Sequence, residues 1–144
     1  MWTVRVIGLP MSKGNLKCFG VGGRHRLTEA ATPDKGEWRR RVTAAGEAIR
    51  ATVGEQLTGP VSMEITFTMP RPKSVSRTAR VWPTTKPDLD KLERLILDAF
   101  TDAGVWVDDA QVVEQQKRKA YPDTPAPDLT PSGGALIRIW RTET

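Results

Sequence analysis

Acidic residues gather in one short segment of a chain that is otherwise basic. This segment, KPDLDKLERLILDAFTDAGVWVDDAQVV, covers residues 86–113 and has Asp88 and Asp90 near its start and Asp108 and Asp109 near its end. Because like charges repel, carboxylates concentrated in a small domain favour a bound divalent cation. Hard Mg²⁺ prefers carboxylate oxygens, so these aspartates are the first candidates for metal chemistry.

The charge distribution sets this segment apart from the rest of the chain. Residues 1–86 carry 15 Lys/Arg against 6 Asp/Glu, residues 87–109 carry 2 against 7, and residues 110–144 carry 5 against 4. The whole chain has a formal net charge of +5 and a sequence pI near 9.7. A basic protein favours an anionic partner, with nucleic acid first. A basic surface around an acidic metal site suits an enzyme that holds phosphates and hydrolyses them.

Asp88 and Asp90 are two residues apart. In an extended segment two such side chains point to the same side, so both carboxylates can face one ion. Pro87 disfavours the helical conformation at Lys86, which fits an extended approach to the pair. An alternative stays open, because Asp90 followed by Glu93 has the spacing of a capping box and aspartate is favoured at helix N-termini.

Asp108 and Asp109 follow a hydrophobic stretch, residues 105–107, that we expect to be a short strand. Taken alone, this pair is equally typical of an ordinary turn at a strand end. A helix of about 13 residues between the two acidic pairs would span roughly 20 Å. A strand returning along that helix could bring Asp108 and Asp109 back beside the helix N-terminus. Three or four carboxylates meeting there would repel one another without a cation, so the joint pattern predicts one metal site.

The sequence has few of the residues that other catalytic mechanisms need. The single cysteine, Cys18, excludes an internal disulfide and a cysteine-rich zinc site. The single histidine, His25, lies between two arginines in a glycine-rich segment, which disfavours a Ser-His-Asp triad or a histidine-rich metal site. We find no phosphate-binding loop of the GxxxxGK[ST] kind. Without a signal peptide or an apolar stretch of roughly 18 residues, we expect a cytoplasmic protein.

The hydrophobic pattern predicts one domain over residues 1–144, an α+β (mixed α/β) fold with a single small sheet and two helices. The expected element order is β-α-β-α-β-β-β. The strands are expected over residues 2–9, 61–69, 105–107, 111–121 and 135–140, and the helices over residues 33–53 and 90–103. Two long basic loops, residues 10–33 and 70–87, lie between these elements and are long enough to be functional.

Residues 86–113 resemble the signature of the RusA family of Holliday junction resolvases. In that family a D-L-D-N-L motif precedes a helix ending in D-A-L, then a glycine, an aromatic-hydrophobic strand and D-D-x-Q-V. The matching residues here read DLDKL, DAF, GVWV and DDAQV. The resemblance implies a bacterial or phage-encoded homodimer, a Mg²⁺-dependent endonuclease for which Mn²⁺ can substitute. It also implies that the substrate is a four-way DNA junction, in recombination and repair.

The family's three essential aspartates fall on Asp88, Asp90 and Asp109, which the resemblance makes the catalytic metal ligands. Asp108 takes the adjacent acidic position and is an additional candidate. One or two Mg²⁺ ions held by these residues would polarise the scissile phosphate and activate a water molecule.

Two positions depart from the family pattern. The family's catalytic lysine, four residues beyond the second aspartate, falls on Arg94, which we expect to stabilise charge on the phosphate. Arginine keeps the charge and can hold phosphate through two hydrogen bonds, but it does not readily lose a proton. The asparagine after DLD is Lys91 here, which could supply a compensating lysine near the metal. A lysine on the strand after the second acidic pair falls on Lys119.

Basic side chains in the two long loops, in the turn around residues 39–41 and in the segment 117–119 could hold the arms of a junction by their phosphates. Each such patch could equally be a solvated face. The DNA-binding candidates are Lys13, Lys17, Arg24, Arg26, Arg39, Arg40, Lys73, Arg77, Arg80, Lys86, Lys117 and Lys119.

A homodimer is also expected from the residues themselves. A two-fold dimer matches the approximate symmetry of a four-way junction and offers two active sites for paired cuts. The chain has more apolar surface than a small sheet obviously needs for its core. This surface comes from the apolar face of the second helix and from Trp2, Trp82, Trp106 and Trp140.

Three other functions stay open at this point. The chain could be a nuclease selective for flaps or forks, or a DNA-junction-binding module that has lost catalysis through the change at Arg94. It could also be a Mg²⁺-dependent phosphatase or nucleotidyl transferase for small substrates, although that gives no reason for the basic loops.

Overall fold

The computed structural model describes residues 1–12, 18–21, 24–27, 33–76 and 81–143 of the chain, with backbone alone for residues 18–21, 24–27 and 33–35. The elements in chain order are β1 (Trp2–Ile7), β2 (Cys18–Val21), β3 (Arg24–Leu27), α1 (Pro33–Val53), β4 (Val61–Thr68), α2 (Leu89–Asp102), the 3-10 turn η1 (Asp109–Gln111), β5 (Val112–Ala120) and β6 (Gly134–Arg141). In this described part, no helix combines the length and the apolar character needed to cross a membrane.

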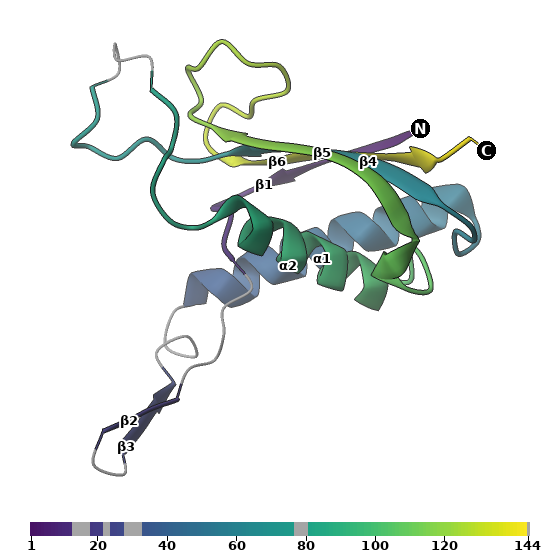
Figure 1. Ribbon diagram of the computed structural model, residues 1–144, viewed down its shortest axis with the longest axis horizontal. Coiled ribbons are helices and arrows are strands. Elements are labelled where there is room, and N and C mark those ends of the chain that lie inside the picture. Colours follow the sequence, from purple (N-terminus) through teal and green to yellow (C-terminus); the bar gives the residue numbers. More distant parts are fainter. Residues whose placement is uncertain (13–17, 22–23, 28–32, 77–80, 144) are drawn as a thin grey trace.

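The main sheet, seen nearly edge-on in Figure 1, has four strands in the order β1-β6-β4-β5. β6 pairs antiparallel with both β1 and β4, whereas β5 pairs parallel with β4. A parallel neighbour requires a crossover connection, and α2 supplies it. The register sets Val112 opposite Val61 and Ala120 opposite Thr68. β5 therefore begins where β4 begins and ends where β4 ends.

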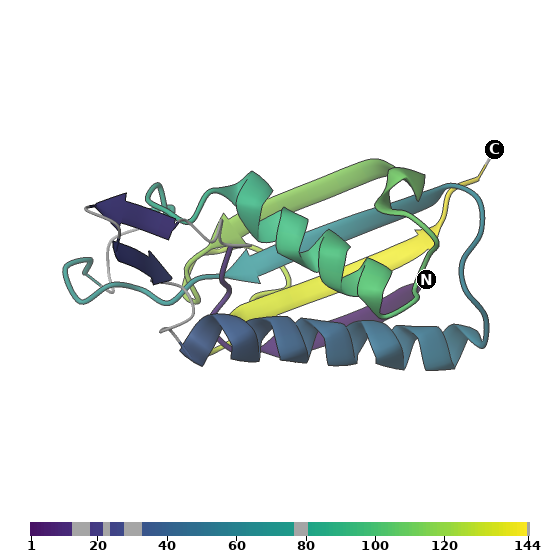
Figure 2. The same cartoon turned by 90° about the horizontal axis from the view of Figure 1, so that it is seen from below.

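Both helices cover the same face of this sheet (Figure 2). Alternate residues of β4, among them Ile65 and Phe67, are fully buried beneath them. The apolar stripe of α2 is buried as well and consists of Leu92, Leu95, Ile96, Ala99 and Phe100. Burying these side chains between the sheet and the two helices is the main stabilising contribution of the fold.

α1 and α2 approach each other closely at Gly46. A side chain at this position would bring a Cβ atom to 2.9 Å from the Cβ of Ala103 and 3.1 Å from the ring of Phe100. Because glycine has no Cβ atom, the end of α2 can rest directly on α1. This contact fixes the position of α2, which carries the first acidic pair.

An ion-pair network lies on the sheet face opposite the helices. The guanidinium of Arg138 donates to both carboxylate oxygens of Asp128, at 2.6 and 2.8 Å, and to Glu64 at 2.8 Å. These hydrogen bonds from Arg138 hold the pKa of Asp128 below its ordinary value. The network ties the loop before β6 to the centre of the sheet.

The predicted fold class, one small mixed sheet with two helices, is confirmed. Two local predictions were wrong. Within the expected loop 10–33, β2 and β3 form an antiparallel pair of their own. Residues 105–107 are not a strand, because only Trp106 forms an isolated bridge, to Leu57. Trp106 is fully buried and packs on Phe100 with ring centroids 5.8 Å apart. Trp106 and the apolar face of α2 therefore belong to the core of one chain and give no argument for a dimer.

Candidate active site

Asp88 and Asp90 lie at the N-terminal end of α2. Asp88 has extended backbone angles and immediately precedes the helix, yet its side chain accepts no capping hydrogen bond. That side chain is 50% exposed. Asp90 is exposed in the first helical turn and forms no hydrogen bond or ion pair within the described residues. Both carboxylates therefore keep oxygens free for a ligand, beside the positive end of the helix dipole.

The capping-box explanation of the DLD motif is wrong, although Asp90 does lie in the first turn of α2, where the helix dipole favours a carboxylate. α2 begins at Leu89, so Asp88 and not Asp90 occupies the cap position. Glu93, the expected partner in a capping box, instead forms an ion pair with Lys117 of β5. Neither aspartate side chain therefore uses its oxygens to cap the start of α2.

Two cations accompany this acidic pair. The ammonium of Lys91 lies 3.8 Å from a carboxylate oxygen of Asp88. Arg94 is exposed one helical turn beyond Asp90, on the same side of α2. Its guanidinium forms no hydrogen bond or ion pair within the part of the chain that the structure describes. An incoming phosphate would therefore meet a free guanidinium beside the carboxylates.

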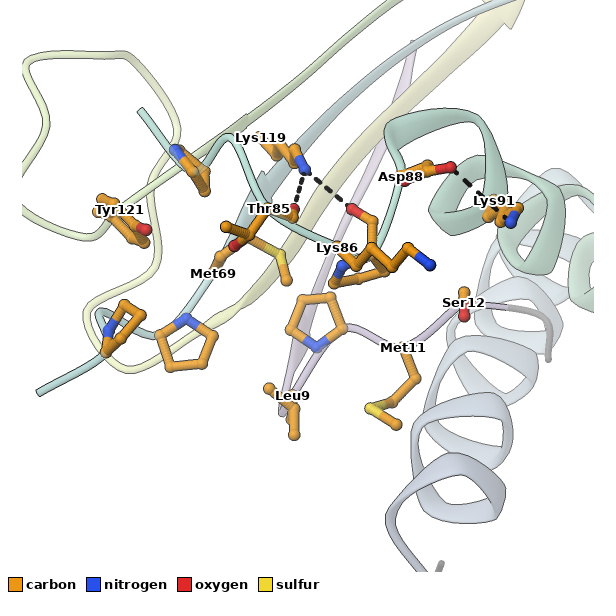
Figure 3. A pocket seen from close by; sticks show the side chains of 15 residues that line it. Leu9, Met11, Ser12, Met69, Thr85, Lys86, Asp88, Lys91, Lys119 and Tyr121 are labelled. Atoms are coloured by element: carbon orange, nitrogen blue, oxygen red, sulfur yellow. Dashed lines mark hydrogen bonds and ion pairs between the residues drawn. The ribbon is translucent and has the colours of Figure 1, made fainter. Parts of the chain in front are cut away.

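Lys119, near the end of β5, holds the segment that leads into Asp88. Its ammonium donates to the carbonyl oxygen of Thr85 at 2.7 Å and to that of Pro87 at 2.8 Å (Figure 3). The Lys86–Pro87 peptide bond in this segment is cis. Two of the three ammonium protons of Lys119 are thus used within the protein, and this lysine positions the acidic pair.

The second acidic pair forms a hydrogen-bonded turn. A carboxylate oxygen of Asp108 accepts the backbone N–H of Ala110 at 3.0 Å and caps η1. This hydrogen bond, and a further one with Asp109, hold the pKa of Asp108 below its ordinary value. Asp108 is therefore committed to the turn, whereas Asp109 is the first, half-buried residue of η1.

Gln111 fixes this turn on the body of the protein. Its side-chain oxygen accepts the backbone N–H of Asp108 at 3.1 Å, which completes a capping box. Its side-chain nitrogen donates to the carbonyl oxygens of Leu57 and Gly59, both at 3.0 Å. Our reading of the sequence missed this role, although Asp108 and Gln111 have the capping-box spacing that could have revealed it.

Within one chain the start of α2 and the turn η1, which carry the two acidic pairs, lie at opposite ends of the β4–α2–β5 unit (Figure 2). Asp109 directly precedes the start of β5, whereas Asp88 lies by Lys119, at the other end of that strand. Val112 and Lys119 are seven positions apart along β5, a length of about 23 Å. The expectation that a returning strand brings Asp108 and Asp109 beside the helix N-terminus is therefore wrong for a single chain. Among the described residues, no group of three or more potential ligands could hold a metal ion.

A cavity of about 450 Å³ opens directly beside Asp88 (Figure 3). Leu9, Met11 and Met69 line it together with several prolines, and Lys86, Lys91 and Asp88 stand at one side. These residues come from the segment after β1, from the end of β4 and from the loop before α2. The sequence offered no sign that these segments enclose a cavity, apart from the density of prolines in residues 70–87.

The candidate DNA-binding residues have different surroundings. Arg39 forms an ion pair of 2.5 Å with Asp102, whereas Arg40, Lys73 and Lys86 are exposed. Lys117 and Lys119 have the protein partners given above. Lys13, Lys17, Arg77 and Arg80 lie outside the described residues, and Arg24 and Arg26 belong to β3, whose side chains are not described.

Comparison with known proteins gives matches that cover about half of this chain or more. Residues 8–129 match the family model described as Endodeoxyribonuclease RusA. A Bacillus subtilis (strain 168) protein named Uncharacterized protein YqaN is 37% identical over 78 residues, which cover 48% of this chain and 54% of that protein. Proteins named crossover junction endodeoxyribonuclease RusA from Enterobacteria phage 82 and Escherichia coli K12 are each 34% identical over 76 residues, covering 53% of this chain and 61% of theirs. The matches thus span little more than half the length of these relatives.

Proposed function

This chain belongs to the RusA family of endodeoxyribonucleases, and we propose that it is a Mg²⁺-dependent, structure-selective nuclease that resolves four-way DNA junctions in recombination and repair. The observation that carries this proposal is the exposed pair Asp88 and Asp90, whose carboxylates are not used to cap the helix they begin. Two of the relatives are named crossover junction endodeoxyribonucleases, which supports a branched DNA substrate.

The carboxylates of the site fit a hard divalent cation. Asp88, Asp90 and Asp109 supply oxygen donors of the kind that Mg²⁺ prefers, and Mn²⁺ accepts the same set. When bound there, the metal would polarise the scissile phosphate and lower the pKa of a water nucleophile. Asp108 keeps its role in the turn and adds negative charge nearby.

The basic side chains of α2 would act on the phosphate itself. The guanidinium of Arg94 can hold two oxygens of a phosphate at once and stabilise the charge that develops on them during cleavage. Lys91, at 3.8 Å from Asp88, offsets the negative charge that would otherwise repel DNA. Both side chains start from the first two turns of α2, which places them beside the acidic pair.

The separation of Asp88 from Asp109 within one chain supports a homodimer with composite sites. β5 is an edge strand of the sheet, and Val113 on it is 61% exposed. An edge strand offers unpaired backbone groups to a second chain. In an antiparallel pairing of two β5 strands about a two-fold axis, the start of one strand lies beside the end of the other. Asp109 of one protomer would then approach Asp88 and Asp90 of its partner.

The charges along β5 support one register of this pairing. With Gln116 on the two-fold axis, each Glu114 lies opposite Arg118 of the other protomer. Opposite charges in directly facing positions stabilise an antiparallel pair by roughly 0.2–1 kcal/mol. Such a dimer has two composite sites related by the axis, which suits paired cuts in a four-way junction.

The test compares DNA structures under identical conditions. A mobile four-way junction, a duplex, a flap, a fork and a single strand are incubated with the protein in Mg²⁺ and in EDTA. We expect paired cleavage of the junction only with the metal, and loss by orders of magnitude in Asp88→Asn. Faster cutting of the flap or fork would assign that alternative function instead. Tight junction binding without any cleavage would leave a binding module.

A further inference from the structure

The cavity beside Asp88 has walls of an unusual kind. Five prolines line it, together with Leu9, Met11, Met69 and Tyr121. Proline has no backbone N–H, so these walls present flat, rigid, apolar faces with few hydrogen-bond donors. A cavity of about 450 Å³ lies within the size range of small-molecule sites, which have mostly apolar walls and a few polar groups.

Three of the charged groups that line this cavity lie on the side of the acidic pair. Figure 3 shows Lys86, Asp88 and Lys91 on the side of the cavity toward α2, whereas Met69 and Tyr121, which are both buried, lie on the other side. The site therefore has a charged margin and an apolar interior. A nucleotide has the same division, with an anionic phosphate at one end and a flat aromatic base at the other.

We propose that this cavity receives an unstacked nucleobase of the nucleotide that flanks the scissile phosphate. This inference rests on the proposed function, because it takes Asp88 as part of the cleavage site. The phosphate would lie at the margin with Lys86 and Lys91, and the attached base would enter between the prolines and Met69. The base gains contact with apolar surfaces that replace its stacking neighbours in DNA.

The chemistry of the walls predicts what is recognised. Pro and Met side chains contact the face of any base and do not read a hydrogen-bond pattern. Ser12, Thr85 and Tyr121 contribute the few hydroxyl groups among the lining residues. The apolar part of the cavity therefore selects for a base that can leave its stack. Extruding a base costs least where its pairing and stacking are weakest. In an open four-way junction every arm ends at the branch point, where stacking is interrupted although the bases are paired.

The test combines two changes. Abasic sites remove single bases from the DNA, and a bulky substitution fills the cavity in the protein. Junctions carrying a single abasic site at each nucleotide around the branch point are compared with the intact junction. Leu9→Trp places a large ring at the mouth of the cavity, where Leu9 is 42% exposed and its replacement leaves the core untouched. Ile7→Trp is the matched control, because Ile7 is 45% exposed and does not line the cavity.

Affinity is measured in EDTA, and the cleavage rate is measured in Mg²⁺. At one abasic position we expect the wild type and Ile7→Trp to bind roughly tenfold more weakly than to the intact junction, the size typical of losing one base contact. Leu9→Trp should bind the intact and abasic junctions equally. If Leu9→Trp does not fold, as judged by circular dichroism, Met11→Trp fills the same cavity from a neighbouring position.

The two readouts separate this inference from the proposed function. Equal wild-type affinity for the intact junction and for every abasic junction would overturn the base site, even if the junction is cleaved. A base preference that persists in the cavity-filling variant would overturn it as well. A base preference that Leu9→Trp abolishes, without cleavage in Mg²⁺, would retain the site and reject the nuclease.

Discussion

Lys119 and Pro87 are joined by a hydrogen bond of 2.8 Å, in which the ammonium donates to the carbonyl oxygen directly before Asp88. A second bond, to the carbonyl of Thr85 at 2.7 Å, comes from the same nitrogen. Because β5 is part of the main sheet, these bonds tie the position of Asp88 to that sheet. A lysine that could be taken for a DNA contact is thus an internal support of the site.

Replacing Lys119 should loosen this support. Lys119→Met keeps the apolar stem and removes both hydrogen bonds, so we expect the free energy of unfolding to fall by about 1–3 kcal/mol. The cleavage rate should fall more than junction affinity, because Asp88 is no longer held in place. Urea denaturation and single-turnover cleavage measure the two effects. Lys73→Met, at an exposed lysine of the proline-rich loop, is the control for stability and should leave the free energy of unfolding unchanged. Wild-type stability and rate in Lys119→Met would contradict this role.

Two inactive variants should restore activity to each other. Asp88→Asn and Asp109→Asn each remove one anionic ligand, and each homodimer should lose cleavage by orders of magnitude while still binding the junction. In a mixed dimer with composite sites, one site carries both changes and the other carries none. We therefore expect nicking of one strand after the two proteins are mixed, measured on a denaturing gel. No activity in verified mixed dimers would show that each site belongs to one chain.

The β5 pairing can be trapped chemically. Gln116→Cys, made together with Cys18→Ser, places one thiol per chain on the expected two-fold axis. Mild oxidation should give a disulfide-linked dimer in high yield, seen by non-reducing electrophoresis. Thr52→Cys, at an exposed position of α1 far from β5, should cross-link poorly under the same conditions. Equal yields for both thiols would remove the support for this interface.

Arg94 should act on the rate more than on binding. Arg94→Ala should lower the cleavage rate roughly 100- to 1,000-fold, as expected for loss of a group that stabilises transition-state charge. Junction affinity should change less than threefold, and Arg94→Lys should keep much of the activity. Arg50→Ala, in the last turn of α1, controls for the loss of one positive charge. A wild-type rate for Arg94→Ala in saturating Mg²⁺ would assign Arg94 to charge balance alone.

The Asp128–Arg138 pair should make stability depend on pH in the acidic range. Arg138 holds the pKa of Asp128 below its ordinary value near 3.8. A carboxylate with a lowered pKa stabilises the fold above its unfolded pKa, and this contribution is lost as the pH falls through the folded pKa. Asp128→Asn should therefore cost about 1–3 kcal/mol at pH 5 to 8 and progressively less below pH 4. Asparagine also tolerates the positive φ of 68° at this position.

Urea unfolding of both proteins across this pH range measures that difference. Asp102→Asn removes an exposed ion pair with Arg39 and should cost less than about 1 kcal/mol at any pH. A difference between the wild type and Asp128→Asn that stays constant down to pH 2 would show that the ion pair is not its source.

Hydrophobic periodicity was sufficient to predict both helices and four strands, because each has one buried face. It did not predict how β5 pairs. A strand after α2 can run parallel or antiparallel to β4, and periodicity alone does not distinguish the two. In the observed parallel pairing Val112 lies opposite Val61. Asp109 therefore lies at the end of the sheet away from Asp88.

Local motifs were partly misassigned for a related reason. Asp90 and Glu93 have the capping-box spacing, but Glu93 meets Lys117, which is remote in sequence. The functioning capping box is formed by Asp108 and Gln111. The cavity beside Asp88 could not be predicted either, because residues as distant as Leu9 and Tyr121 enclose it only once the chain has folded.

The distance between Asp88 and Asp109 within one chain also bears on when the protein can cut DNA in the cell. In the composite-site dimer proposed above, a chain without its partner would hold only an incomplete set of ligands and would leave DNA uncut. At low expression, where most chains are unpaired, activity would rise with the square of protein concentration. The level of expression would then act as a threshold below which the nuclease is silent.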